Sequence, residues 1–438
     1  MRRVAEVAMR ALARLLIRIF FRQVEVRQAE HLPAAGPVVL VANHINGLVD
    51  GLLLMAQLDR FPRFLGKSTL FKVPPLWPFL KLGGVIPVYR QVDGATGDQN
   101  ASAFTSCHEI LRRGGLVALF PEGISHDESS LQPLRTGAAR VALEAGVDHG
   151  VPGLSMIAVG LTYDAKARFR SRALIRMTEP VPVAGWAEAY RQNPQETVRR
   201  VTAEVANLLN SVSPPYASWA QAERLGWIAD VVARPPQGSL PDEVALADQA
   251  SVAEELAQAE RRGVSTADLL SASGEYERDL TLLGLTDAQV VAKYPKGHLR
   301  RTLVWSIFKV AAALPLAALG FVVHVIPFQI MKRIAKVPSN EGIKATVKLL
   351  GCTVFFTLVY AGLGVLAGRT FGAWAGVATA VAAPVCGYVT VRLAERVQRI
   401  GGLLEGYHTV RGRRAVLSTV VAHRADVVRA ACLVRDAP

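Results

Sequence analysis

The stretch Val38-Val39-Leu40-Val41-Ala42-Asn43-His44 decides the fold, because a short apolar run ends abruptly in polar side chains. Runs of this kind alternate with helical patterns from Val24 to about Ser213. In chain order, these strand-like and helical segments are GLLLMAQL (51–58), GVIPVYR (84–90), a helical pattern over 103–113, LVALFPEG (116–123), ARVALEAG (139–146) and GLSMIAVGLTY (153–163). Such alternation is typical of an α/β domain. We expect a central mixed sheet flanked by helices, with the active site where strands end.

The whole chain is basic and apolar. Its 438 residues carry a formal net charge of +14, with a pI near 9.9, and 51% of them are apolar. Nucleic acid, an acidic lipid surface and a phosphorylated substrate are all suitable anionic partners. The sequence contains no recognised finger, helix-turn-helix or stacking motif, so we expect no nucleic acid. The four cysteines form no CxxC pair, which argues against a zinc site or a disulfide framework.

The apolar excess is concentrated near the C-terminus. Residues 349–368 and 370–391 are uncharged runs of 20 and 22 residues, separated only by Arg369. Each is long enough to cross a hydrocarbon core of about 30 Å as a helix. Basic residues precede the first run and follow the second, so we expect a transmembrane hairpin with both ends in the cytoplasm. Residues 310–326 form a shorter apolar run that holds Pro315, and we expect this segment to be interfacial or re-entrant.

The remaining segments are assigned from their patterns. Within residues 1–23, Arg10, Arg14, Arg18 and Arg22 recur every four residues beside an apolar face. We expect a basic amphipathic helix, and two readings stay open: it lies among lipid headgroups, or it packs on the α/β domain. The other expected parts are the α/β domain over 24–215, a helical connector over 216–300, a membrane-associated region over 301–400 and a C-terminal tail over 401–438.

Two motifs contain residues that suit acid–base and anion-binding chemistry. His44 stands at a strand end and Asp50 follows one short turn later. A carboxylate bonded to one ring nitrogen fixes the tautomer and makes the other nitrogen a base for a substrate hydroxyl. The turn Phe120-Pro121-Glu122-Gly123 is expected to expose the Glu122 carboxylate and to leave backbone amides near Gly123 open to a ligand.

A third motif is the strand that leads to Arg90. Its sequence is Gly84-Val85-Ile86-Pro87-Val88-Tyr89-Arg90. An arginine just beyond a strand suits bidentate phosphate binding, because its guanidinium is planar and always charged. Each motif alone has a structural explanation, namely a hydrogen-bonded pair, a strand corner and a surface arginine.

Together, these motifs resemble those of the glycerolipid (PlsC-like) acyltransferase family. The resemblance covers about residues 38–182, with 157–163 as a fourth block that lacks the proline many relatives carry. Most of the family places four residues between the histidine and the aspartate, whereas five separate His44 from Asp50. This spacing, and the Phe-Pro-Glu-Gly-x-Ser-His-Asp run at 120–127, look like the branch of glycerol 3-phosphate and dihydroxyacetone phosphate acyltransferases.

The resemblance implies a role for each matching residue. It makes His44 the general base and Asp50 its orienter, with Arg90 and Glu122 binding the acceptor and Gly123 shaping the pocket. Lys67 falls where relatives often have a basic residue, and it either assists phosphate binding or is solvated. Acyl transfer from a thioester needs a base but no metal or redox cofactor.

We therefore expect a membrane-bound O-acyltransferase of phospholipid biosynthesis, with its catalytic domain on the cytoplasmic face. It would transfer an acyl group from acyl-CoA or acyl-carrier protein to glycerol 3-phosphate or dihydroxyacetone phosphate, with membrane lipid as a further partner. No GxSxG elbow is present, so we expect direct transfer without an acyl-enzyme. The alternatives are a lysophosphatidate or other lysophospholipid acyltransferase and, from another class, a non-catalytic lipid-binding scaffold.

Overall fold

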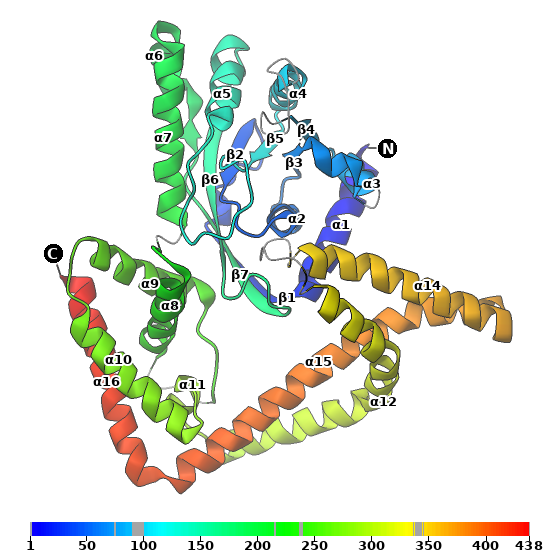
Figure 1. Cartoon of the computed structure of the whole chain (residues 1–438), viewed down its shortest axis with the longest axis vertical. Coiled ribbons are helices and arrows are strands. Elements are labelled where there is room, and N and C mark those ends of the chain that lie inside the picture. Colours follow the sequence, from blue (N-terminus) through cyan, green and yellow to red (C-terminus); the bar gives the residue numbers. More distant parts are fainter. Residues whose placement is uncertain are drawn as a thin grey trace. The chain divides into compact units, whose positions relative to one another are not determined.

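The computed structural model describes residues 2–73, 76–89, 100–213, 216–235, 240–335, 337, 344 and 346–437. The chain forms two compact units (Figure 1). Unit 1 comprises Met1–Pro215 and Ala335–Cys352, and unit 2 comprises Tyr216–Ile334 and Thr353–Pro438.

Unit 1 is built on an eight-stranded sheet with the order β1-β7-β6-β2-β5-β3-β4, and β8 pairs with β6. Strands β6, β2, β5, β3 and β4 are parallel, whereas β7 is antiparallel to β6 and parallel to β1. The expected mixed sheet is therefore confirmed. The strands are β1 (Phe21–Arg27), β2 (Val38–Ala42), β3 (Pro62–Lys67), β4 (Ile86–Val88), β5 (Leu116–Leu119), β6 (Ser155–Tyr163), β7 (Ser171–Met177) and β8 (Val181–Pro182).

Helices cover both faces of this sheet, which is why its central strands are continuous apolar runs. Leu40 of β2 lies in one core with α1 and α2, and its neighbours Val39 and Val41 lie in a second core with α4, α5 and α7. The helices are α1 (Arg2–Phe20), α2 (Leu48–Gln57), α3 (Trp77–Leu82), α4 (Ala101–Arg112), α5 (Gly137–Leu143), α6 (Ala187–Gln192) and α7 (Pro194–Val212).

Unit 2 contains a helical cluster with its own core. Helices α8, α9 and α10 contribute Leu225, Leu256 and Tyr276 to this core, and α16 contributes Val420 and Val427. The helices of the cluster are α8 (Trp219–Ala233), α9 (Leu246–Arg261), α10 (Ala267–Leu283), α11 (Asp287–Val291) and α16 (Arg414–Asp436).

Among the residues that the structure describes, three further helices are long and apolar enough to cross a membrane. They are α12 (Lys296–Ile334), α14 (Cys352–Phe371), which continues from a π-helical turn at Val347–Gly351, and α15 (Ala373–Gly412). Residues 310–326, which we expect to be interfacial or re-entrant, lie inside the first of these helices, α12, which accommodates both Pro315 and Pro327.

The structure also places the boundaries between parts differently from the sequence analysis. The core-facing side chains of α1 are buried with those of the sheet, so this helix belongs to unit 1. The segment 335–352 belongs to unit 1 as well. Residues 414–436 are a helix packed in the core of α8–α11 and are not a separate tail.

Candidate active site

His44 is held at the carboxyl end of β2 by the residue before it. The side chain of Asn43 continues the pairing of β2 with β6 beyond the last strand residue. Its Nδ2 donates to the Leu161 carbonyl oxygen at 3.1 Å, and the Leu161 amide donates to Asn43 Oδ1 at 2.7 Å. His44 therefore lies at the edge of the parallel strands where ligands bind in open α/β sheets.

The loop after His44 returns Asp50 to the imidazole. Asp50 Oδ2 lies 2.9 Å from His44 Nδ1. Gly47 makes the turn possible with a φ of 58°, a conformation that a side chain disfavours, and α2 begins at the next residue. The five-residue spacing thus brings the histidine and the aspartate together.

Asp50 is fully buried, and both of its carboxylate oxygens have donors. Besides His44, the Asn46 amide donates to Oδ2 at 2.8 Å, and the Tyr163 hydroxyl donates to Oδ1 at 2.5 Å. Burial, together with the negative charge of Asp50, raises the pKa of Tyr163 well above its ordinary value. The hydroxyl therefore keeps its proton and remains a donor to the carboxylate.

The His44 ring has one nitrogen available for chemistry. Because Nδ1 faces the Asp50 carboxylate, Nδ1 carries the proton and Nε2 is left with a lone pair. Nε2 has no hydrogen-bond partner among the residues that the structure describes, and 19% of the side chain is exposed. Phe120, which follows β5, stacks on the ring with the centroids 4.0 Å apart and fixes its plane. This arrangement can accept a proton from a hydroxyl.

The expectation that Glu122 exposes its carboxylate is wrong, because that side chain is fully buried. Its Oε1 accepts from the His44 backbone amide at 2.7 Å. Its Oε2 accepts from His126 Nε2 and from the Gln132 amide. The Glu128 amide donates to His126 Nδ1 at 3.2 Å, which places the His126 proton on Nε2, facing Glu122.

Of the other predicted site residues, the structure describes Gly123 and Lys67 but not Arg90. Gly123 is exposed with a φ of 72°, and its amide donates to the Phe120 carbonyl, so this amide is not open to a ligand as expected. Lys67 is half-buried at the end of β3, next to β4. Arg90 lies outside the described residues. Tyr89, before it, is held by Asn100, whose side chain bonds both the Tyr89 amide and its carbonyl.

Sequence reasoning assigned no role to Tyr163, His126 or Phe120. Tyr163 and His126 stood inside quoted motifs, but nothing local shows that one binds Asp50 and the other Glu122. Tyr163 and Asp50 are 113 positions apart, and only the adjacency of β6 and β2 brings them together.

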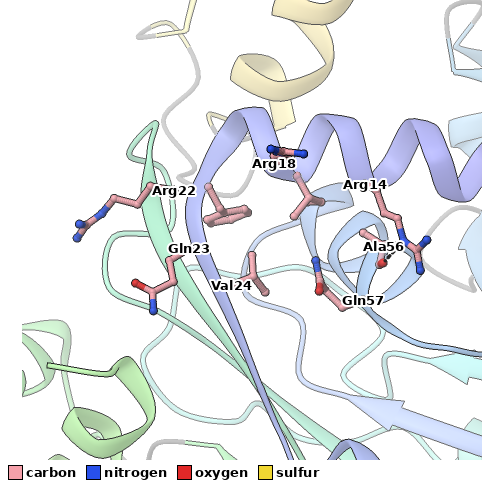
Figure 2. Close-up of a pocket in the computed structure, with 9 residues that line it drawn as sticks. Arg14, Arg18, Arg22, Gln23, Val24, Ala56 and Gln57 are labelled. Carbon is pink, nitrogen blue, oxygen red and sulfur yellow. Dashed lines mark hydrogen bonds between the residues drawn. The ribbon is translucent and has the colours of Figure 1, made fainter. Parts of the chain in front are cut away.

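A separate basic pocket of about 390 Å³ lies between α1, β1 and α2 (Figure 2). Arg14, Arg18 and Arg22 line it, and Arg14 Nε donates to the Ala56 carbonyl at 3.1 Å. None of the five predicted site residues that the structure describes lines this pocket.

The fold and the His44–Asp50 pair are those that the sequence analysis predicts for an acyltransferase, and the similarity of the chain to known proteins agrees with this class. The Acyltransferase family model matches residues 23–160, which include every predicted site residue. This part of the chain is an acyltransferase domain of the PlsC-like family.

The relatives are named as acyltransferases of glycerol 3-phosphate or of its 1-acyl derivative. The chain is 37% identical over 115 residues to "Glycerol-3-phosphate O-acyltransferase 2" of Saccharomyces cerevisiae, covering 26% of this chain and 16% of the relative. It is 31% identical over 164 residues to "1-acyl-sn-glycerol-3-phosphate acyltransferase alpha" of Ovis aries, covering 37% and 55%. The chain thus spans less than two thirds of each of these relatives. A crystal structure of PlsC from Thermotoga maritima matches 47% of this chain and 80% of its own, with 20% identity and a TM-score of 0.34.

Proposed function

We propose that the chain is a membrane-bound acyltransferase that moves a fatty acyl group from acyl-CoA or acyl-carrier protein to glycerol 3-phosphate or dihydroxyacetone phosphate. The observation that carries the proposal is the His44–Asp50 pair. Its Nδ1 is bonded to a buried carboxylate and its Nε2 is available at the carboxyl edge of the sheet, within an acyltransferase domain.

In the proposed reaction, His44 Nε2 removes the proton from the acceptor hydroxyl as the oxygen attacks the thioester carbonyl carbon. The C–O bond forms, the C–S bond breaks, and the leaving thiolate takes the proton back from the imidazolium. Asp50 stays ionised and stabilises the imidazolium while it exists. A positioned base of this kind contributes about 10²- to 10⁴-fold in rate.

Two basic residues bind the acceptor in this proposal. Arg90 and Lys67 would bind its phosphate, since β4 and β3, which lead to them, are paired neighbours. Glu122 is already occupied by protein donors, so we assign it the task of holding the His44 backbone in place. Its direct contact with the acceptor stays a prediction.

The proposed site of action is a membrane surface on the cytoplasmic side. Helix α1 packs Ala13 and Ile17 into the core of unit 1 and exposes Val4, Val7 and Leu15. An exposed apolar face beside a row of arginines suits an anionic lipid surface. The basic residues before α14 and after residue 391 favour the cytoplasmic side for both ends of the hairpin.

A lysophosphatidate acyltransferase is the second candidate. It is favoured by the relatives named 1-acyl-sn-glycerol-3-phosphate acyltransferases, of which the Ovis aries protein covers more of this chain than the yeast enzyme does. The two candidates share the base and the donor and differ only in the acceptor.

The test is acyl transfer by the purified full chain in detergent, with one labelled acyl-CoA and each acceptor offered in turn. Released thiol and labelled product are measured together. We expect product with glycerol 3-phosphate, and product with lysophosphatidate alone would favour the second candidate.

Two histidine variants make this assay specific. His44→Ala should abolish transfer, whereas His423→Ala should not, although His423 Nδ1 lies 2.7 Å from Asp279 in a comparable pair within unit 2. Equal activity of His44→Ala and the unaltered chain would refute the proposal. So would a stable acyl-protein adduct formed from donor alone.

A further inference from the structure

Helices α12, α14 and α15 each meet the length and hydropathy of a membrane span, which would suggest three crossings. The residues at the ends of these helices are, however, held by contacts inside the two units. These contacts limit how many times the chain can cross a membrane.

The segment before α14 is anchored to the α/β domain. Leu349 is 4% exposed and lies in the core shared by α1, α2 and the sheet, and Leu350 packs against that core. Lys348 Nζ donates to the Ala167 carbonyl, in the loop between β6 and β7, at 2.5 Å. The chain therefore enters α14 from the side of the membrane on which the α/β domain lies.

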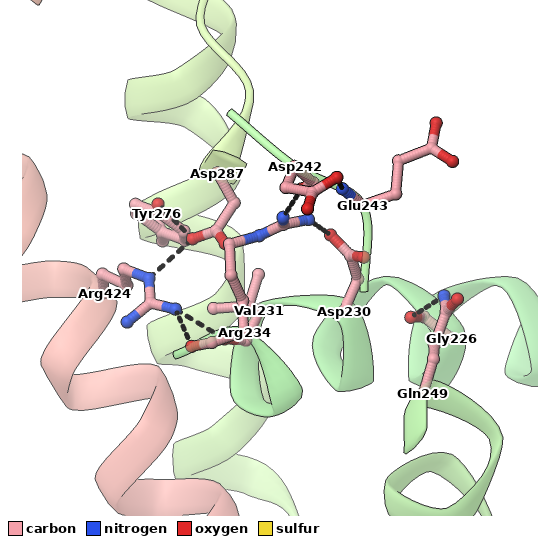
Figure 3. Close-up of polar contacts among 10 residues, drawn as sticks. All are labelled: Gly226, Asp230, Val231, Arg234, Asp242, Glu243, Gln249, Tyr276, Asp287 and Arg424. Atoms are coloured by element: carbon pink, nitrogen blue, oxygen red, sulfur yellow. Dashed lines mark hydrogen bonds and ion pairs between the residues drawn. The ribbon is translucent and has the colours of Figure 1, made fainter. Parts of the chain in front are cut away.

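The segment after α15 is anchored to α8 and α11. Arg424 of α16 is buried, and its Nε donates to Asp287 of α11 at 2.7 Å (Figure 3). Its Nη2 donates to the carbonyl oxygens of Val231 and Arg234, at the end of α8. The last part of α15 is held as well, because Gln289 Nε2 donates to the Gly402 carbonyl at 2.6 Å. The chain therefore leaves α15 on the side where α8–α11 lie.

Chain connectivity makes these two sides the same. Only residues 214–215 separate Ser213, at the end of α7, from Tyr216. The three peptide steps between these two residues span at most about 11 Å, far short of a hydrocarbon core of about 30 Å. Helix α12 begins just after α11 on this side, and residue 346 is again with the α/β domain. Between them, residues 335–345 include Lys336, Glu341 and Lys344 and are too short for a helical span.

Helix α12 must therefore make an even number of crossings. Two crossings need about 40 residues plus a turn, whereas α12 has 39 residues in one helix. The even number is consequently zero. Helices α14 and α15 together start and end on the same side of the membrane. Each of the two helices therefore crosses the membrane once.

We propose that α14 and residues 373–391 of α15 form a two-helix membrane hairpin. We propose also that α12 inserts into the membrane leaflet on the side of the α/β domain, without crossing the membrane. Lipid then covers the exposed apolar surface of α12. Helix α12 exposes large apolar side chains along its length, and it bends in its C-terminal third, where Pro327 removes a backbone donor (Figure 1). The exposed side chains are Val304, Trp305, Ile307, Phe308, Leu314, Leu316, Leu319, Phe321, Val322, Ile326, Phe328, Ile330 and Ile334.

Contacts within unit 2 attach α12 to the hairpin. Gly320 lets α12 approach α15 closely, and Thr390 Oγ1 donates to the Ala317 carbonyl at 2.9 Å. His324 is satisfied by its neighbours, with Nδ1 2.7 Å from the Gly320 carbonyl and Nε2 2.8 Å from the hydroxyl of Tyr360 in α14. An ionisable ring in this apolar region is thus directed toward protein and away from lipid.

The test is the sidedness of cysteine labelling in vesicles of both orientations, using the full chain and a membrane-impermeant maleimide. The exposed Cys432 is replaced by serine, and this parent measures labelling of the remaining thiols. Single cysteines are then placed at four exposed positions, which are Leu282 before α12, Val337 after it, Phe371 at the end of α14 and Leu433 in α16. Detergent-solubilised samples show that each cysteine can react.

We expect Leu282→Cys, Val337→Cys and Leu433→Cys to be labelled from one side and Phe371→Cys only from the other. Labelling of Val337→Cys from the side opposite to Leu282→Cys would mean that α12 crosses, and labelling of all four from one side would mean that no hairpin exists. Labelling of Val337→Cys in detergent only would place the segment after α12 inside the membrane. Each of these three results overturns the proposal, and none depends on catalytic activity.

Discussion

The substitution Tyr163→Phe tests whether the buried carboxylate beside His44 is held by its donors. It removes the hydroxyl that donates to Asp50 Oδ1 at 2.5 Å and keeps the ring, which stacks on Phe21. A hydrogen bond to a charged group contributes about 1.5–3 kcal/mol, so we expect the free energy of unfolding to fall by about 2 kcal/mol. Part of this loss should appear in catalysis, because a less firmly held Asp50 orients the His44 imidazole less well.

We expect kcat for acyl transfer to fall about tenfold, which corresponds to about 1.4 kcal/mol of transition-state stabilisation. The KM values for donor and acceptor should stay within about twofold, because Tyr163 contacts neither substrate in the proposed mechanism.

Tyr190→Phe is the matched control for this experiment. Its hydroxyl donates to Asp148 at 3.1 Å, away from His44, so the variant loses a comparable bond outside the site. It should lose stability with no change in kcat. A Tyr163→Phe enzyme with unaltered kcat would refute the assigned role of Tyr163.

Three further predictions follow from other buried polar groups. His126→Ala should lower the free energy of unfolding by about 1–3 kcal/mol, since the buried Glu122 loses a donor, and urea denaturation would measure the loss. Burial and the nearby charge of His149 lower the pKa of His108 to about 4 from 6.5. His108 therefore stabilises the fold above about pH 6.5, and this contribution is lost as the pH falls through 4, so His108→Leu should flatten thermal stability across that range. Asp287→Asn should destabilise unit 2 by about 3–5 kcal/mol, because Arg424 loses its buried charge partner, and hydrogen exchange in α8–α11 would report it.

Each of these predictions has a contrary result. Unaltered stability of His126→Ala would show that Glu122 does not need this donor. An unchanged pH dependence in His108→Leu would show that another group controls acid stability. Faster exchange in unit 1 instead of unit 2 would show that Asp287 does not hold the α8–α11 cluster.

The residues around His44 show how far local patterns reach. The apolar run of β2 and its polar end predict the sheet edge at which His44 lies. The contact between His44 and Asp50 is also local, because one short turn of the chain brings the two residues together. Glu122 shows the limit, because a Phe-Pro-Glu-Gly turn predicts an exposed carboxylate. The donors that bury it include the His44 amide, 78 positions away, and no local pattern carries that information.

The sequence by itself determined the alternation of strands and helices, the lengths of the apolar helices and the histidine–aspartate pair, because each depends on spacing within a few tens of residues. Tertiary structure alone decided that Tyr163 holds Asp50 and that α16 packs with α8–α11. It also decided that the segment before α14 is buried with the α/β domain. These contacts join positions that are 100 or more residues apart, and they form only when strand order and helix packing bring them together.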